Sequence, residues 1–126
     1  MYSELTLQYF RSALGAGSAA GAGVLTGPNT FRGAAGSRAH GAWVQFDLQA
    51  AAQVIQAARF LAFACPHTIA VSAWVAERAV GHVLRPALPE SVEDLSERFA
   101  VPVEKKGRLL IIEDAWIAAV TGALQR

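Results

Sequence analysis

The chain has 126 residues and a net charge of +1, because eleven basic residues face ten acidic ones. This near-neutral charge gives no electrostatic reason to expect nucleic acid or an anionic membrane as a partner. A hydrophobic fraction of 53% suffices for one globular domain over residues 1–126, and a single cysteine excludes an intrachain disulfide and fits a reducing compartment. We therefore expect a soluble, cytoplasmic protein.

The N-terminal part is predicted to hold one short helix and a flexible segment. Ser3 suits the N-cap of a helix that runs to about Leu14. Residues 15–36 are dense in glycine and alanine, which predicts a mobile arm or loop. A short strand near residues 24–26 or 29–32 is the alternative within this segment.

Two strands are predicted next. Residues 40–48 alternate between apolar and polar side chains, which is the pattern of a half-buried strand. Residues 54–64 are apolar on both faces and are typical of a central strand. The short connection between them favours antiparallel pairing.

Helices follow in the C-terminal half. Pro66 suits the first turn of a helix, and Gly81 suits its C-terminal end. A short helix begins at Ser91 and runs through about Phe99, and a last helix with an apolar stripe begins near Lys106. The pattern predicts an α+β fold with a small antiparallel sheet and helices packed on one face.

Cys65 stands between the second predicted strand and Pro66. A free cysteine is commonly a small buried hydrophobe. A cysteine just before a helix N-terminus is also a candidate for reactivity, because the helix dipole favours the thiolate. We favour the reactive interpretation over the structural one.

His40 and His67 leave three interpretations open. Thiolate and imidazole are ligands for zinc or iron, so both histidines and Cys65 could form a single-metal site. Exposed loop histidines are at least as well supported. A cysteine enzyme with Cys65 as nucleophile and either histidine as base is the third hypothesis, and we assign no catalytic residue.

Four segments carry a resemblance to a known family. They are Tyr2-Ser3-Glu4, the alternating strand, the turn FACPHTIAVSAWVAE and the stretch Ile112-Glu113-Asp114-Ala115. In this order they resemble iron–sulfur cluster scaffold proteins of the IscU type and the N-terminal domain of NifU. The resemblance implies a three-stranded antiparallel sheet packed against about four to five helices.

The resemblance also implies candidate site residues. Members of the family bind a two-iron cluster, or zinc in its place, through three cysteines and usually an aspartate. Cys65 matches the second cysteine, whereas Arg38 and Arg108 stand at the positions of the other two and His40 at that of the aspartate. The chain then resembles a divergent scaffold that binds an iron–sulfur cluster, iron, zinc or transferred sulfur through Cys65, with His40 and His67 as helpers.

Arginine at two ligand positions supports an alternative. Arg38 and Arg108 would turn a metal pocket into an anion pocket around Cys65, in a metal-free binding or regulatory paralogue. Pro102 and Lys105 are candidate partner-binding residues, because they stand where the family carries its chaperone-docking motif. The implied partner is a cysteine desulfurase or a scaffold paralogue, and a scaffold or binding role is expected instead of an enzymatic one.

Overall fold

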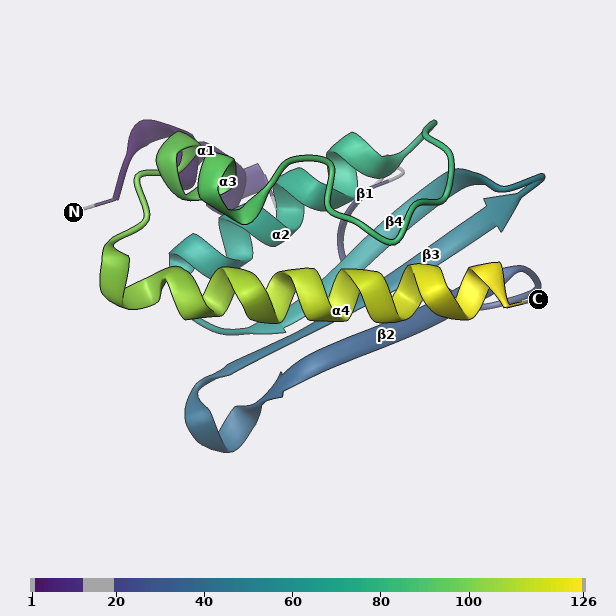
Figure 1. Ribbon diagram of the computed structural model, residues 1–126, viewed down its shortest axis with the longest axis horizontal. Coiled ribbons are helices and arrows are strands. Elements are labelled where there is room, and N and C mark those ends of the chain that lie inside the picture. The colour runs from purple at the N-terminus through teal and green to yellow at the C-terminus, as the bar shows by residue number, and fades with distance from the viewer. Residues whose placement is uncertain (1, 13–19, 126) are drawn as a thin grey trace.

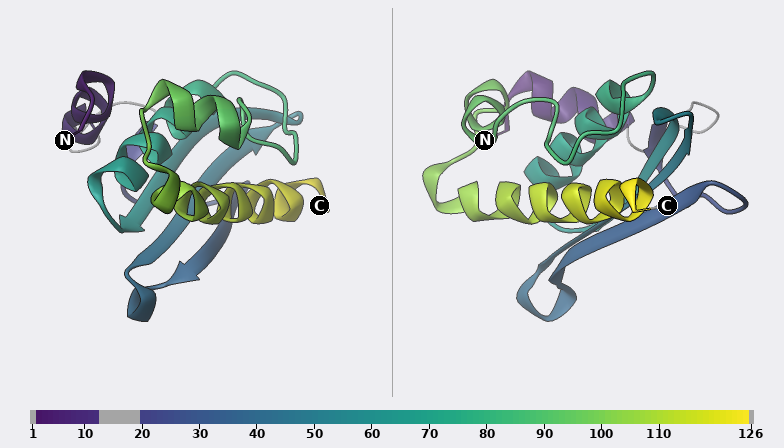
Figure 2. Two further views of the ribbon diagram at one scale, coloured as in Figure 1. Left: turned by 60° about the vertical axis from the view of Figure 1, so that its left-hand side comes forward. Right: turned by 45° about the vertical axis from the view of Figure 1, so that its right-hand side comes forward.

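The computed structural model describes residues 2–12 and 20–125 of the chain. Within these ranges, four strands form one mixed sheet. Figures 1 and 2 show this sheet together with the helices of the chain. The strands are β1 (Ala20–Ala22), β2 (Thr30–Ser37), β3 (Ala42–Ala51) and β4 (Val54–Phe63). The helices are α1 (Glu4–Ser12), α2 (Pro66–Ala79), α3 (Val92–Arg98) and α4 (Lys106–Leu124), with the 3₁₀ turns η1 (Arg38–His40) and η2 (Val103–Lys105).

The predicted α+β class is confirmed, but the predicted three-stranded antiparallel sheet is wrong. β2, β3 and β4 do pair in antiparallel fashion. β1 adds a fourth strand parallel to β4, which gives the order β1-β4-β3-β2. Because β1 reads only Ala-Gly-Ala, backbone hydrogen bonds hold it, and no side-chain pattern could reveal it.

The prediction of a loop over residues 15–36 is wrong from residue 20 onward, because this part contains β1 and all of β2 except Ser37. The alternative of a strand at residues 29–32 overlaps the start of β2, whereas residues 24–26 lie between the two strands. Residues 15–19 lie outside the described residues. Gly33 explains why small residues are needed in β2, since a Cβ there would lie 2.2 Å from the backbone nitrogen of Ala119 and 2.6 Å from the carbonyl oxygen of Ala115. The missing side chains therefore let α4 rest directly on the strand.

The ends of the other elements lie close to their predicted places. Ser3 is the N-cap of α1 and accepts a hydrogen bond from the Thr6 N–H at 3.1 Å, although the predicted end at Leu14 lies outside the described residues. Ser91 caps α3 by accepting the Asp94 N–H at 3.1 Å. Gly81 follows α2 with a φ of 89°, the left-handed conformation that glycine adopts readily.

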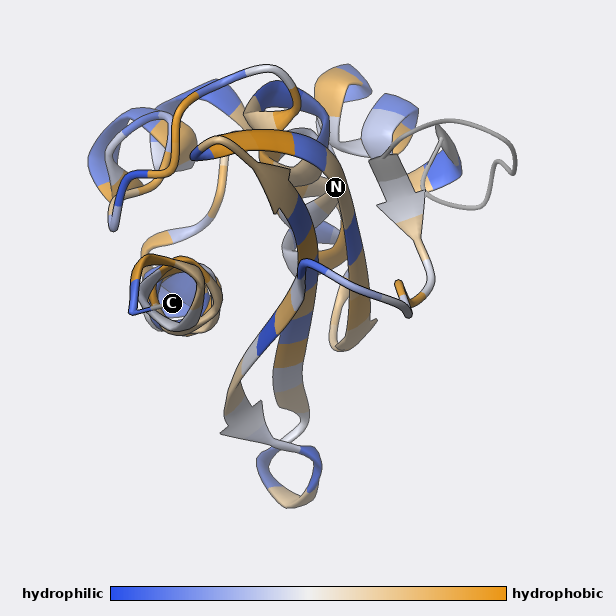
Figure 3. Cartoon of the chain, turned by 90° about the vertical axis from the view of Figure 1, so that its right-hand side faces the viewer, coloured by the Kyte–Doolittle hydropathy of each residue, from blue (hydrophilic) through white to orange (hydrophobic). Residues whose placement is uncertain are grey.

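A single apolar core lies between the sheet and the helices. Figure 3 shows α4 end-on at one side of strands that are banded with hydrophobic and hydrophilic residues. Val44, Phe46 and Leu48 of β3 are fully buried in this core. Phe46 meets Trp116 edge to face, with ring centroids 5.2 Å apart. The predicted stripe of α4 is buried, namely Leu109, Ile112, Trp116, Ala119, Val120 and Ala123.

The described helices include none whose length and apolar character would let it cross a membrane.

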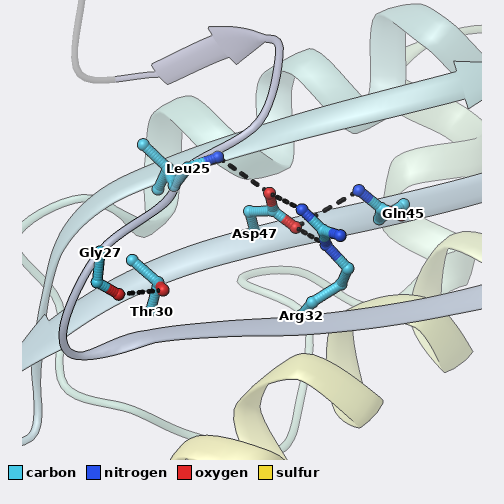
Figure 4. Close-up of polar contacts among 6 residues, drawn as sticks. All are labelled: Leu25, Gly27, Thr30, Arg32, Gln45 and Asp47. Atoms are coloured by element: carbon cyan, nitrogen blue, oxygen red, sulfur yellow. Dashed lines mark hydrogen bonds and ion pairs between the residues drawn. The ribbon is translucent and has the colours of Figure 1, made fainter.

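β3 also buries one carboxylate on its other face (Figure 4). The side chain of Asp47 is 2% exposed. Its oxygens accept hydrogen bonds from Arg32 at 2.8 and 3.0 Å and from the Leu25 N–H at 2.9 Å. Gln45 adds a longer bond of 3.4 Å. Asp47 thus ties the segment between β1 and β2 to the sheet.

We expect Asp47→Ala to lower the free energy of unfolding by about 2–3 kcal/mol, because charge-assisted hydrogen bonds are lost and the Leu25 N–H loses its acceptor. Urea denaturation measures this change. Asp114→Ala removes an exposed carboxylate from α4 and should change the free energy by no more than about 0.5 kcal/mol. Equal losses in the two variants would contradict the role of Asp47.

Candidate functional site

Cys65 is the N-cap residue of α2, as the sequence predicts. Its backbone is extended, with φ −74° and ψ 165°, and Pro66 follows in the first helical turn. The side chain is half-buried. Its Sγ lies 3.6 Å from the Thr68 Oγ1, so a Cys65 thiolate would accept a hydrogen bond from that hydroxyl. The strand-to-helix turn therefore holds the sulfur beside the positive end of the helix dipole.

The surroundings of Cys65 favour its thiolate. Burial alone would raise the pKa of the thiol. The backbone and hydroxyl of Thr68, together with the positive charges of Lys105 and Arg108, outweigh burial and bring the pKa of Cys65 below its ordinary value. A lowered pKa increases the fraction of nucleophilic thiolate at neutral pH.

His67 is buried in the first turn of α2, with only 3% of its surface exposed. Neither ring nitrogen has a hydrogen-bond partner among the described residues. The Tyr2 ring packs edge-on against the imidazole at a centroid distance of 4.6 Å, and the Lys105 Nζ lies 5.6 Å from the centroid of Tyr2. Burial and then Lys105 lower the pKa of His67, so the imidazole is held neutral.

His67 should make stability depend on pH. Its pKa is lowered in the folded state from the ordinary 6.5, so the unfolded chain binds a proton more readily. The contribution of His67 is therefore present above pH 6.5 and is lost as the pH falls below 6.5 toward the lowered folded pKa. We expect His67→Phe to flatten this acid-side loss in urea denaturation at several pH values. His82→Gln alters an exposed histidine and should keep the wild-type slope, whereas a wild-type slope in His67→Phe would contradict this role.

Arg38 and His40 lie on η1, at the tip of the β2–β3 hairpin, which projects away from the helices (Figures 1 and 2). Both side chains are exposed. The Arg38 guanidinium lies over the Trp43 ring at 4.8 Å from its centroid. The cations that act on Cys65 are Lys105 and Arg108, and Arg38 is not among them. The structure thus joins Arg108, but not Arg38, to the Cys65 site.

The donor groups present do not fit a metal centre held by this chain alone. Within residues 2–12 and 20–125, no three His, Cys, Asp or Glu side chains lie close enough together to hold a metal ion. Cys65, His40 and His67 consequently do not form a three-ligand group. One cysteine in the chain also cannot supply the several thiolates with which proteins hold iron–sulfur clusters.

Thr68 and Lys105 also act on Cys65, and the sequence predicts neither of them as part of its site. Thr68 stands three residues after Cys65, and this spacing places its hydroxyl 3.6 Å from the Cys65 sulfur. Lys105 was assigned only to partner binding. Lys105 ends η2, and its positive charge acts on Cys65. No local pattern reveals this interaction, because the two residues are far apart in sequence.

The chain is similar to proteins of one family. A family model described as "NifU-like N terminal domain" matches residues 13–125. A candidate iron–sulfur cluster assembly scaffold protein for the SUF system from Fervidobacterium islandicum AW-1 is 13% identical, with a TM-score of 0.71 over 94% of this chain and 96% of that chain. A nitrogen-fixing NifU-like protein (N-terminal) from Brucella abortus is 18% identical, with a TM-score of 0.70 over 98% and 94%. Among curated proteins, none matches the chain.

Proposed function

The chain belongs to the family of NifU-like N-terminal domains, and from this premise we propose that it receives sulfur for iron–sulfur cluster assembly on the thiolate of Cys65. The observation that carries the proposal is the position of this sulfur at the N-terminus of α2, 3.6 Å from the Thr68 hydroxyl. Lys105 and Arg108 add positive charge. In such surroundings a half-buried cysteine has a lowered pKa, so more of it is present as the nucleophilic thiolate.

The transfer is a thiol–persulfide exchange. The Cys65 thiolate attacks the terminal sulfur of a persulfide on the donor, and a new S–S bond forms on Cys65. The S–S bond of the donor breaks, and the electron pair leaves with the donor thiolate. One sulfur atom moves, so no external oxidant or reductant is consumed. Lys105 and Arg108 stabilise the negative charge of the Cys65 thiolate before the exchange and that of the donor thiolate after it.

The sulfur donor is proposed to be a cysteine desulfurase, which docks beside Cys65. Phe63 precedes Cys65 by two residues and is 53% exposed, and Val103 precedes Lys105 by two residues and is 79% exposed. Large apolar side chains that stay exposed favour burial against a partner. Pro102 and Lys105 lie in the same segment as Val103 and are proposed to contact the docked protein. In this proposal the chain accepts sulfur in the cytoplasm and performs no catalytic turnover of its own.

Mass spectrometry of the intact protein tests the transfer. The protein is mixed with a cysteine desulfurase that has been loaded by free cysteine, and the adduct is mapped after digestion. We expect a gain of one sulfur atom on Cys65 in the wild type and none in Cys65→Ser. Failure of the wild-type protein to gain sulfur, or a gain that persists in Cys65→Ser, would overturn the proposal.

A metal-free binding or regulatory role is the second candidate function. It is favoured by the lack of any three-ligand metal group among the described residues, together with the two cations that act on Cys65. In this case Cys65→Ser should still bind the desulfurase and slow its turnover of cysteine. Binding without sulfur transfer to the wild type would favour this second role over the first.

A further inference from the structure

A second site lies at the other end of α2. A cavity of about 480 Å³ opens beside the last turn of this helix, where Arg78 lines it. At 1.5 Å per residue, Arg78 stands about 20 Å along the helix from Cys65. Cavities between about 300 and 1,000 Å³ are the usual size of small-molecule sites. The cavity is therefore large enough for a ligand and is separate from the cysteine.

The charged residues of the cavity are mostly positive. Arg78, Arg85, Arg98 and Glu90 all line it. Glu90 accepts two hydrogen bonds from Arg98, at 3.1 and 2.6 Å, and so neutralises that guanidinium. Arg78 and Arg85 make no ion pair within the described part of the chain. Two guanidinium groups are thus left to attract an anion.

The guanidinium groups of Arg78 and Arg98 lie over one aromatic ring. Arg78 lies over Trp74 at 5.2 Å from the ring centroid, and Arg98 lies over the same ring at 5.6 Å. Two cations beside one ring repel each other, and Glu90 forms an ion pair with only one of them, Arg98. An anionic group bound at Arg78 would offset this repulsion and accept charge-assisted hydrogen bonds, and Arg85 lines the same cavity.

The rest of the lining is apolar. Ile55 of β4, Leu88 of the segment between α2 and α3, and Trp116 of α4 contribute to it. The Trp116 Nε1 donates a hydrogen bond to the Ala87 carbonyl oxygen at 3.1 Å, which fixes this segment at the cavity. Val83, at the cavity, is 56% exposed. These walls would bury a flat hydrocarbon body while the arginines hold its charge.

We propose that this cavity binds a small organic anion whose carboxylate, sulfonate or phosphate meets Arg78 and Arg85 and whose flat apolar body lies against Ile55 and Leu88. The site requires neither Cys65 nor a metal. This proposal is independent of whether the chain receives sulfur, because no group of the cysteine site lines the cavity.

Fluorescence titration with anilinonaphthalene sulfonate tests the site, because this probe joins an apolar aromatic body to a sulfonate. We expect saturable binding of one probe per chain. Arg78→Gln and Arg85→Gln should each weaken it about tenfold, which corresponds to the loss of roughly one charge-assisted contact. Arg38→Gln is the matched control, since Arg38 also stacks on a tryptophan but lies on the hairpin tip. It should bind the probe as the wild type does.

Two further comparisons keep the test decisive. Uncharged phenylnaphthylamine has the same aromatic body, so its affinity should not change in Arg78→Gln or Arg85→Gln. Val83→Trp should obstruct the cavity and weaken binding of the sulfonate, whereas Val24→Trp at another exposed valine should not. Equal affinity of the sulfonate in all variants, or absence of saturable binding to the wild type, would overturn the proposal.

Discussion

Gly33→Ala is expected to abolish the native fold or to lower the free energy of unfolding by more than about 4 kcal/mol. The new Cβ would lie 2.2 Å from the Ala119 nitrogen and 2.6 Å from the Ala115 oxygen. Both of these atoms belong to the backbone of α4, so no side-chain rotation relieves the clash. The helix would have to move away from β2, which would also open the core around Trp116.

Gly122→Ala is the matched control for this substitution. Gly122 lies in α4 itself, and a Cβ there meets no atom within 4 Å. Alanine is the better helix former, so this variant should be stabilised by up to about 1 kcal/mol. Urea denaturation monitored by circular dichroism measures both variants. A Gly33→Ala protein as stable as the wild type would show that α4 does not rest on β2 as described.

Reversal of the two charges near Cys65 is expected to have the largest effect on its chemistry. In the double variant Lys105→Glu and Arg108→Glu, two carboxylates replace the cations that lower the pKa of Cys65. The pKa should rise, and the rate of sulfur uptake at neutral pH should fall by about tenfold. The rate should recover as the pH is raised, because more of the thiol then ionises.

The control for this variant changes the net charge equally at other places. Arg38→Glu and Lys106→Glu alter two basic residues that do not act on Cys65, since Arg38 stacks on Trp43 and Lys106 pairs with Glu93 at 3.1 Å. Sulfur uptake is measured by mass spectrometry after short reaction times. An equal slowing in the two double variants would mean that overall charge, and not the local field at Cys65, controls the transfer.

Much of the fold could be read from the sequence because its signals are local. The alternation in residues 40–48 predicted β3, and Pro66 and Ser91 predicted the starts of α2 and α3. β1 and β2 were harder to predict, since glycine and alanine carry no periodic signal. β1 is held by its parallel pairing with β4, and β2 is held by its antiparallel pairing with β3 and by the close approach of α4 to Gly33. The contacts of β1 with β4 and of β2 with α4 are distant in sequence.

In the candidate site, too, some residues have a local sequence signal and others depend on contacts distant in sequence. Cys65 could be identified because the neighbouring Pro66 predicts the start of a helix, which makes Cys65 its N-cap. The cations that act on Cys65 depend on tertiary structure, which places Lys105 and Arg108 where their charges act on the sulfur and leaves Arg38 on the hairpin tip. The burial of His67 also follows from packing against Tyr2, and a cysteine-x-histidine spacing does not reveal it. The cavity beside Arg78 has residues from β4, α2, α3 and α4 in its walls, so no single segment of the sequence predicts it.

The most direct measurement is the pH titration of the Cys65 thiolate, followed by its ultraviolet absorbance, with Cys65→Ser as the blank. The hydrogen bond with Thr68 and the positive charges of Lys105 and Arg108 predict a midpoint below the ordinary thiol pKa. They also predict that Lys105→Gln combined with Arg108→Gln moves the midpoint upward. A wild-type midpoint at or above the ordinary thiol value would mean that burial prevails over these interactions, and Cys65 would then be a structural cysteine and not a sulfur acceptor.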